Sequence, residues 1–189
     1  MPLVRILLVL SLVMIPGMAG ALPPNDDIGI TVERRDAVVL ISVDLPLDVS
    51  PEEVWETVTD YDNMSRFLPK LTESRIVSRD GNHLRIAQKG RTSRGFLTFA
   101  FENVRDVVLV PHSEIRSKLV SGTLRKAQSV TRIVRKGSGS RLVNQGEYQP
   151  AAWVPVALAM PFIEAETREQ FGLLRAEIMR RRGRGAGVH

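Results

Sequence analysis

Residues 72–148 alternate between apolar and polar positions in short runs, which is the pattern of consecutive β-strands. In one run Ile115 and Leu119 fall on one face, and Arg116 and Lys118 fall on the other. This alternation predicts an antiparallel sheet with one buried face and one solvated face. An Asp-Gly pair at residues 80–81 indicates a hairpin turn. The six predicted strands span residues 72–78, 83–88, 96–110, 113–120, 124–134 and 141–148.

Two further strand-like runs and two short helices precede this region. β-branched residues recur at every second position in 30–32 and in 39–43, but with different parity. The change of parity predicts either one long strand with a bulge near residues 35–36 or two half-strands. Ser50, Pro51 and Glu53 then form a capping box that begins a short helix, expected to end near residue 60. A second short helix is expected at residues 64–68.

The last predicted element is a long helix. Ile163, Thr167, Phe171, Leu174 and Ile178 recur at intervals of three or four residues, which places them on one helical face. The whole pattern predicts an α+β fold in which a curved antiparallel sheet surrounds a long C-terminal helix. A sheet cannot close completely on one helix, so we expect an apolar cavity between them, suited to a small molecule.

The first residues have the pattern of an export signal. Arg5 precedes an apolar stretch at 6–15, and small residues at 19–21 form an A-x-A cleavage signal. Cleavage after Ala21 is predicted, with an uncleaved anchor as the alternative. Because the chain has no cysteine, an oxidising periplasm is the expected destination, although an extracellular one stays open. The predicted divisions are a signal peptide at 1–21, a linker at 22–27, one domain at 28–182 and a disordered tail at 183–189.

Two stretches of the sequence resemble a known family. Residues 49–71, VSPEEVWETVTDYDNMSRFLPKL, and residues 111–124, PHSEIRSKLVSGTL, resemble signatures of the START-like (SRPBCC) superfamily. The similarity is to its polyketide cyclase/dehydrase and coenzyme Q-binding branch, and it extends over residues 28–182. This resemblance implies a helix-grip fold. Members of the family include lipid carriers, quinone-binding proteins and aromatase/cyclases, so the resemblance does not select one activity.

Ten apolar or aromatic residues are candidates for contact with a ligand. Those on the short helices are predicted at the cavity mouth, those on strands along the buried sheet face, and Tyr148 could offer its hydroxyl to a ligand. Core packing is the alternative for each of them. The uncharged segment 151–162 could cover the cavity entrance, or could form the first turns of the long helix. The candidates are Trp55, Phe67, Leu97, Phe99, Phe101, Ile115, Tyr148, Trp153, Met160 and Phe171.

Few residue patterns in the sequence indicate catalysis or metal binding. There is no cysteine, and one of the three histidines is the last residue, so we expect no metal site, no cofactor and no catalytic residue. His83 and His112 are expected in exposed turns. The basic residues of the strands are expected on the solvated face, where they could attract an anionic membrane surface weakly but not a nucleic acid. They are Arg75, Arg85, Lys89, Arg91, Arg94, Arg105, Arg116, Lys118, Arg125, Lys126, Arg132, Arg135 and Lys136.

These patterns favour an exported protein that binds a hydrophobic small molecule, such as a lipid, an isoprenoid quinone or a polyketide-like compound. Binding would bury the ligand in the cavity without covalent chemistry. Two alternatives stay open: a polyketide cyclase or dehydratase with a pocket acid or base, and an interaction module whose cavity is filled by its own side chains.

Overall fold

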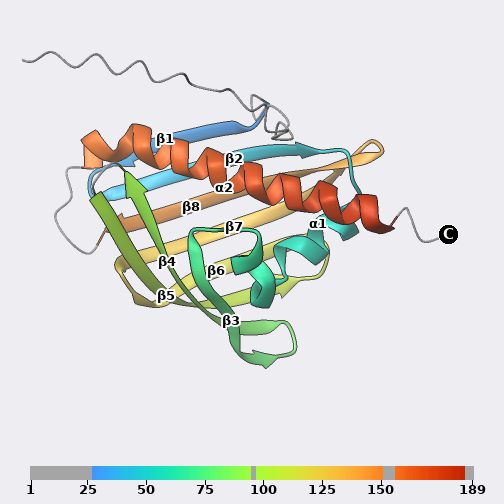
Figure 1. Cartoon of the computed structure of the whole chain (residues 1–189), viewed down its shortest axis with the longest axis horizontal. Helices are drawn as coiled ribbons and strands as arrows, with labels where there is room; N and C mark the ends of the chain where they lie inside the picture. The colour runs from blue at the N-terminus through green and yellow to red at the C-terminus, as the bar shows by residue number, and fades with distance from the viewer. Residues whose placement is uncertain (1–26, 95–96, 151–155, 186–189) are drawn as a thin grey trace, which may run out of the picture.

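One curved antiparallel sheet and one long helix dominate the computed structural model, which describes residues 27–94, 97–150 and 156–185 (Figure 1). In the described residues eight strands follow the order β1-β2-β8-β7-β6-β5-β4-β3. The predicted α+β helix-grip architecture is therefore confirmed. The strands are β1 (Gly29–Arg35), β2 (Val38–Leu47), β3 (Leu71–Asp80), β4 (His83–Arg94), β5 (Leu97–Val110), β6 (Glu114–Gly122), β7 (Leu124–Lys136) and β8 (Gly139–Pro150).

The first two strands form a hairpin rather than one bulged strand. β1 pairs antiparallel with β2, with Arg35 opposite Val38 at the closed end. Asp36 takes a left-handed backbone conformation with φ of 54°, which an aspartate tolerates in a tight turn. The expected bulge at residues 35–36 was wrong. The apolar alternation changes there because the chain reverses direction in a turn, with β1 before the turn and β2 after it.

Two short helices follow β2, as the sequence predicts. Helix α1 (Pro51–Val58) begins at Ser50, whose side chain accepts a hydrogen bond from the Glu53 backbone N–H at 3.3 Å. The Glu53 carboxylate accepts one from the Ser50 backbone N–H at 2.8 Å, which completes the capping box. The 3₁₀ helix η1 (Tyr61–Arg66) comes next and contacts β3.

Helix α2 (Val156–Gly185) lies across the inner face of the sheet (Figure 1). The last turns of α2 pack into a solid core, in which Leu45, Val54 and Ile178 are fully buried. The helix continues to residue 185, past the start of the predicted tail at 183. Residues 1–26, 151–155 and 186–189, which include the predicted signal peptide, lie outside the described residues. No described helix is long and apolar enough to cross a membrane.

Candidate ligand-binding cavity

A cavity of about 350 Å³ lies between α2 and the inner face of the sheet. Its walls come from strands β3 to β8, from α1 and η1, and from the middle turns of α2. This volume is at the lower end of the range found for small-molecule sites in proteins. The cavity lies beneath the middle turns of α2, at Gln170, Phe171 and Leu174, whereas the C-terminal turns reach the solid core at Ile178.

Apolar side chains form a large part of the cavity wall. Phe101 and Ile115 contribute from the sheet, and Phe171 and Leu174 contribute from α2. Phe101 lies over Gly90 of the neighbouring strand, where an added Cβ would come within 2.5 Å of the phenylalanine Cζ. The glycine therefore provides space for the aromatic ring. The remaining apolar members of the wall are Val58, Met64, Leu68, Leu71, Leu119, Leu124, Ala127 and Leu142.

A chain of hydrogen bonds runs through the polar part of the cavity. The Ser74 hydroxyl donates to the Tyr61 carbonyl oxygen at 2.6 Å, and Gln88 Nε2 donates to Ser74 Oγ at 3.0 Å. Gln88 Oε1 accepts a hydrogen bond from Arg105 Nη2. These bonds connect η1, β3, β4 and β5, so they fix the orientation of the Gln88 amide and of the guanidinium beyond it.

Two tyrosines line the cavity near Arg105. Burial raises the pKa of Tyr61 to about 12 and raises the pKa of Tyr148 above its ordinary value, while the positive charge of Arg105 opposes both effects. The side chains of Tyr148 and Ser129 share a hydrogen bond. Both phenols therefore stay protonated at neutral pH and can donate hydrogen bonds to a ligand.

Four of the ten candidate residues line this cavity: Phe101, Ile115, Tyr148 and Phe171. Whether they contact a ligand stays a prediction. Met160 is half-buried in the first turns of α2, outside the cavity wall. The uncharged segment therefore enters the long helix from residue 156 onward. The backbone of Leu97 and Phe99 forms part of β5, but the positions of their side chains lie outside what is described. The whole of Trp153 also lies outside the described residues.

Trp55 and Phe67 lie away from the cavity. The Trp55 ring packs against His112 with ring centroids 5.6 Å apart, because Val54 and Val58 occupy the face of α1 that points inward. Phe67 lies 5.5 Å from the guanidinium carbon of Arg181, a cation–π contact, and lines a separate cleft beside the C-terminal turns of α2.

The polar wall residues were missed by the sequence analysis. Gln88, Asn103, Arg105 and Asn144 all face the cavity. Arg105 was expected on the solvated face, but it has the same parity on β5 as Phe101, so strict alternation places it inside. The alternation of residues along β5 therefore already indicated that Arg105 faces inward. The expectation that a charged residue must be exposed led to the wrong face.

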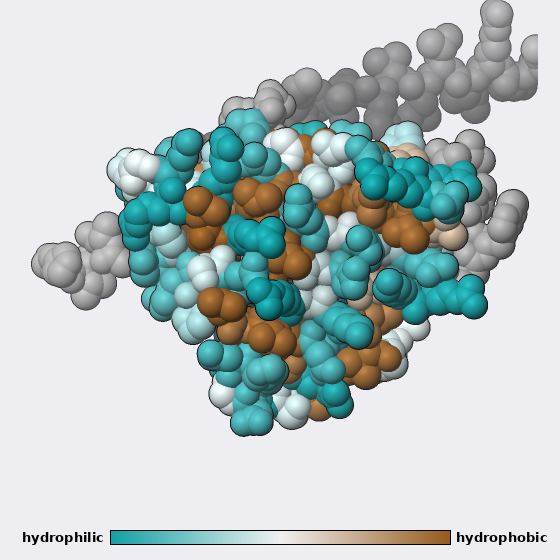
Figure 2. All heavy atoms as spheres, turned by 180° about the vertical axis from the view of Figure 1, so that it is seen from behind, coloured by the Kyte–Doolittle hydropathy of each residue, from teal (hydrophilic) through white to brown (hydrophobic). Residues whose placement is uncertain are grey.

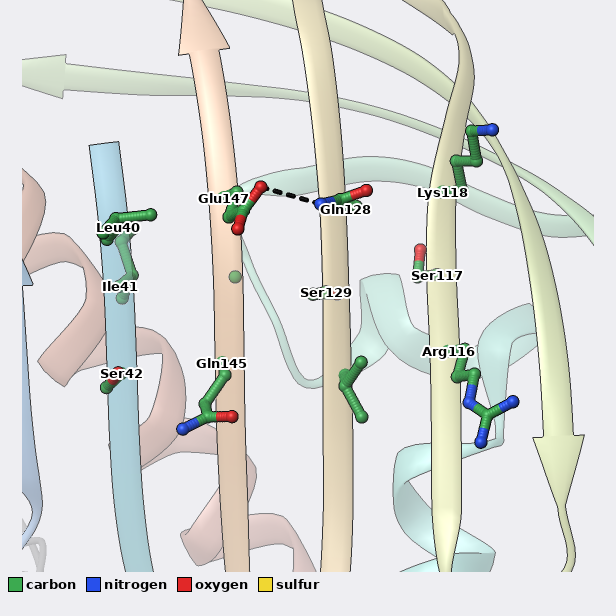
Figure 3. A pocket seen from close by; sticks show the side chains of 12 residues that line it. Leu40, Ile41, Ser42, Arg116, Ser117, Lys118, Gln128, Ser129, Gln145 and Glu147 are labelled. Atoms are coloured by element: carbon green, nitrogen blue, oxygen red, sulfur yellow. Dashed lines mark hydrogen bonds between the residues drawn. The ribbon is translucent and has the colours of Figure 1, made fainter. Parts of the chain in front are cut away.

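A second, shallow hollow lies on the outer face of the sheet, over β2, β8, β7 and β6 (Figure 3). The side chains of Leu40, Arg116, Lys118 and Gln128 point into it, and Gln128 donates a 2.7 Å hydrogen bond to Glu147. Seen from behind, the molecule shows polar residues with small separate hydrophobic patches (Figure 2). In the part of the chain that the structure describes, no cluster of histidine, aspartate and glutamate could hold a metal ion.

Similar folds occur among lipid-transfer proteins and cyclases. The STAR-related lipid transfer protein of Xanthomonas axonopodis superimposes with a TM-score of 0.62 at 11% identity, covering 82% of this chain and 99% of that one. The Zhui aromatase/cyclase of Streptomyces sp. R1128 gives 0.62 at 12% identity, with 76% and 95% coverage. The protein TTHA0849 of Thermus thermophilus gives 0.63 at 15% identity, with 75% and 95% coverage. At these identities the likeness establishes the fold alone.

A family model described as "Polyketide cyclase / dehydrase and lipid transport" matches residues 47–172, which is more than half of the chain. A search of curated proteins finds no match. The matched residues run from the end of β2 into α2, so they include most of the elements that surround the cavity. The chain therefore belongs to the polyketide cyclase/dehydrase and lipid transport family of START-like proteins.

Proposed function

We propose that this protein is a non-covalent carrier of a hydrophobic small molecule, which it holds between the sheet and α2. The observation that carries the proposal is the cavity of about 350 Å³, whose wall combines aromatic and aliphatic side chains with a few polar groups. A ligand that buried about 200 Å² of apolar surface there would gain roughly 5 kcal/mol of binding free energy, at about 25 cal/mol per Å².

The way into the cavity is proposed to open by movement of the N-terminal half of α2. Polar contacts hold this half to the sheet: Lys70 Nζ lies 2.7 Å from both Glu166 Oε2 and Glu169 Oε2, and Thr92 donates to Glu166 at 2.6 Å. The C-terminal half is held by the buried side chain of Ile178. Because polar contacts can be exchanged for water more readily than buried apolar ones, the N-terminal half is the part that opens.

Native mass spectrometry tests the carrier proposal. Protein purified from its own cellular compartment should retain a small molecule. Ser117→Leu, which adds bulk to the inner face, should lose it, whereas Ser42→Leu, an exposed change on the outer face, should keep it. Circular dichroism confirms that each variant is folded. A wild-type protein with an empty cavity that also binds none of decanol, decanoate, decyl phosphate and decylamine would contradict the proposal, as would retention by folded Ser117→Leu.

A second function, polyketide cyclisation, is favoured by one observation. Arg105 and the protonated side chains of Tyr61 and Tyr148 all line the cavity and could stabilise an oxyanion that develops on a ketone substrate. Incubation with a short poly-β-ketone would reveal an intramolecular condensation, in which a carbon–carbon bond forms and one water leaves. Binding without any such product would favour the carrier.

Export to the periplasm and contact with anionic membranes also belong to this proposal. Several cations of the outer sheet face have carboxylate partners: Arg85 lies 2.8 Å from Asp106, and Arg116 lies 2.6 Å from Glu114. This pairing reduces the positive charge that the outer face offers to a membrane, so the proposed membrane contact is weak and transient. Vesicles with anionic lipids should bind the protein only at low ionic strength.

A further inference from the structure

Arg105 is the one charged residue among the described side chains that line the cavity. Other partly buried cations face carboxylates: Lys70 is paired with Glu166 and Glu169, and Arg181 is paired with Glu177 and Asp60. Arg105, by contrast, forms no ion pair with any described residue, and its side-chain partner is the neutral amide oxygen of Gln88. The cavity wall therefore carries one positive charge that the described residues leave uncompensated.

The guanidinium of Arg105 also has unused hydrogen-bonding capacity. Its Nε atom is buried, and no described residue accepts a hydrogen bond from it. A buried donor left in this state costs free energy, and more so when it is charged. The chain through Gln88 and Ser74 to the Tyr61 carbonyl nevertheless holds the guanidinium in place. The guanidinium lines the cavity with no carboxylate of the described residues against it, so it is held in place for an acceptor that a ligand would supply.

The surroundings of Arg105 specify what that acceptor is. Tyr61 of η1 and Tyr148 of β8 add two phenolic donors to the lining of the cavity. A carboxylate or a phosphate carries only acceptors, so it complements this set of donors, whereas an ammonium group would face a like charge. Phe101, four residues from Arg105 and roughly 13 Å along β5, and Phe171 of α2 offer apolar surface to a tail.

We propose that the cavity selects amphiphiles with one anionic oxygen headgroup, a carboxylate or a phosphate, and that Arg105 binds this headgroup while the apolar wall binds the tail. The inference rests on the proposed carrier function, because it requires that the cavity take up a ligand. It goes beyond that function by naming the charge and the polar chemistry of the ligand.

Calorimetric titration with matched ten-carbon probes tests the inference. Wild-type protein should bind decanoate or decyl phosphate at least about tenfold more tightly than decanol, since a hydrogen bond to a charged group contributes roughly 1.5–3 kcal/mol. Decylamine should bind more weakly than decanol. The comparison of decanoate with decyl phosphate shows which anionic headgroup is preferred.

Variants assign this preference to Arg105. Arg105→Gln should weaken decanoate binding at least about tenfold while changing decanol binding less than threefold. Arg116→Gln removes the same charge from the outer face of β6 and should change neither affinity. If Arg105→Gln does not fold, the order of affinities in the wild-type protein decides the question.

Two results separate this inference from the carrier function. If decanol binds as tightly as decanoate, or if Arg105→Gln weakens both equally, the headgroup inference is overturned and the carrier function stands. If none of the four probes binds and the protein from its own compartment holds no molecule, the carrier function itself is overturned.

Discussion

Glu177 is predicted to stabilise the fold through the two arginines that follow it on α2. Its carboxylate accepts hydrogen bonds from Arg180 Nε at 2.7 Å and Nη2 at 2.6 Å, and from Arg181 Nε at 2.7 Å. Arg181 also donates to Asp60 Oδ2 at 2.8 Å, which connects α2 to the start of η1. The side chain of Glu177 is only 9% exposed, so solvent screens these contacts weakly.

The contribution of Glu177 follows from its titration. The hydrogen bond from Arg180 is the largest influence that lowers the pKa of Glu177, from its ordinary 4.5 to about 2, with Arg181 acting in the same direction and burial opposing both. A carboxyl whose pKa is lower in the folded state stabilises the fold above its unfolded pKa, and this stability is lost as the pH falls through the folded pKa. At 1.36 kcal/mol per pH unit the contribution at neutral pH is about 3 kcal/mol.

Glu177→Gln keeps the shape of the side chain and removes its charge. Chemical denaturation at pH 7 should show a loss of about 3 kcal/mol, and a thermal melt should show a Tm lower by roughly 6–12 °C. The difference from wild type should shrink between pH 4.5 and pH 2, because over this range the unfolded chain binds a proton at Glu177 while the folded protein still holds the carboxylate ionised.

Glu164→Gln is the matched control, because Glu164 forms an exposed ion pair with Arg168 on the same helix. Its cost should stay below about 0.5 kcal/mol. A loss for Glu177→Gln no larger than that of the control, or a loss that is the same at pH 7 and pH 2, would refute the reasoning.

Two further predictions concern access to the cavity and the shape of its wall. Lys70→Gln should loosen the N-terminal half of α2 and so speed ligand release roughly fivefold, which corresponds to about 1 kcal/mol. Stopped-flow displacement measures the release rate. Lys89→Gln, on the outer face, should leave the release rate unchanged. Gly146→Ala should displace the Tyr148 ring, since an added Cβ would lie 2.5 Å from Tyr148 Cε2, and should weaken decanol binding by at least about threefold. Equal release rates for the two lysine variants, or an unchanged affinity in Gly146→Ala, would count against the corresponding prediction.

Local sequence signals were sufficient for much of the fold. The alternation of apolar and polar residues located the strands of the second half, and the Ser50–Glu53 capping box located the start of α1. The β1–β2 hairpin was missed because its turn contains no glycine and depends on the positive φ of Asp36. Only the three-dimensional pairing of the strands shows that the chain reverses there.

The candidate site was less accessible from sequence than the fold. Periodicity identified Phe101 and Ile115 on the inner face, but it gave no measure of which inward residues line a space and which fill the core. Trp55 illustrates the difficulty, because a rotation of about 100° per residue on a short helix moves a large side chain away from the cavity. The role of Arg105 depends on Gln88 and Ser74, which come from different strands and show no relation in the sequence.

The most direct test of the account locates a bound ligand in the protein. Isotope-filtered NMR with methyl-labelled protein and unlabelled decanol measures which methyl groups lie close to the bound chain. We expect contacts with methyl groups of Ile115 and Leu174, which line the inner cavity. Contacts confined to Leu40 and Val130, which line the hollow on the outer face of the sheet, would contradict it.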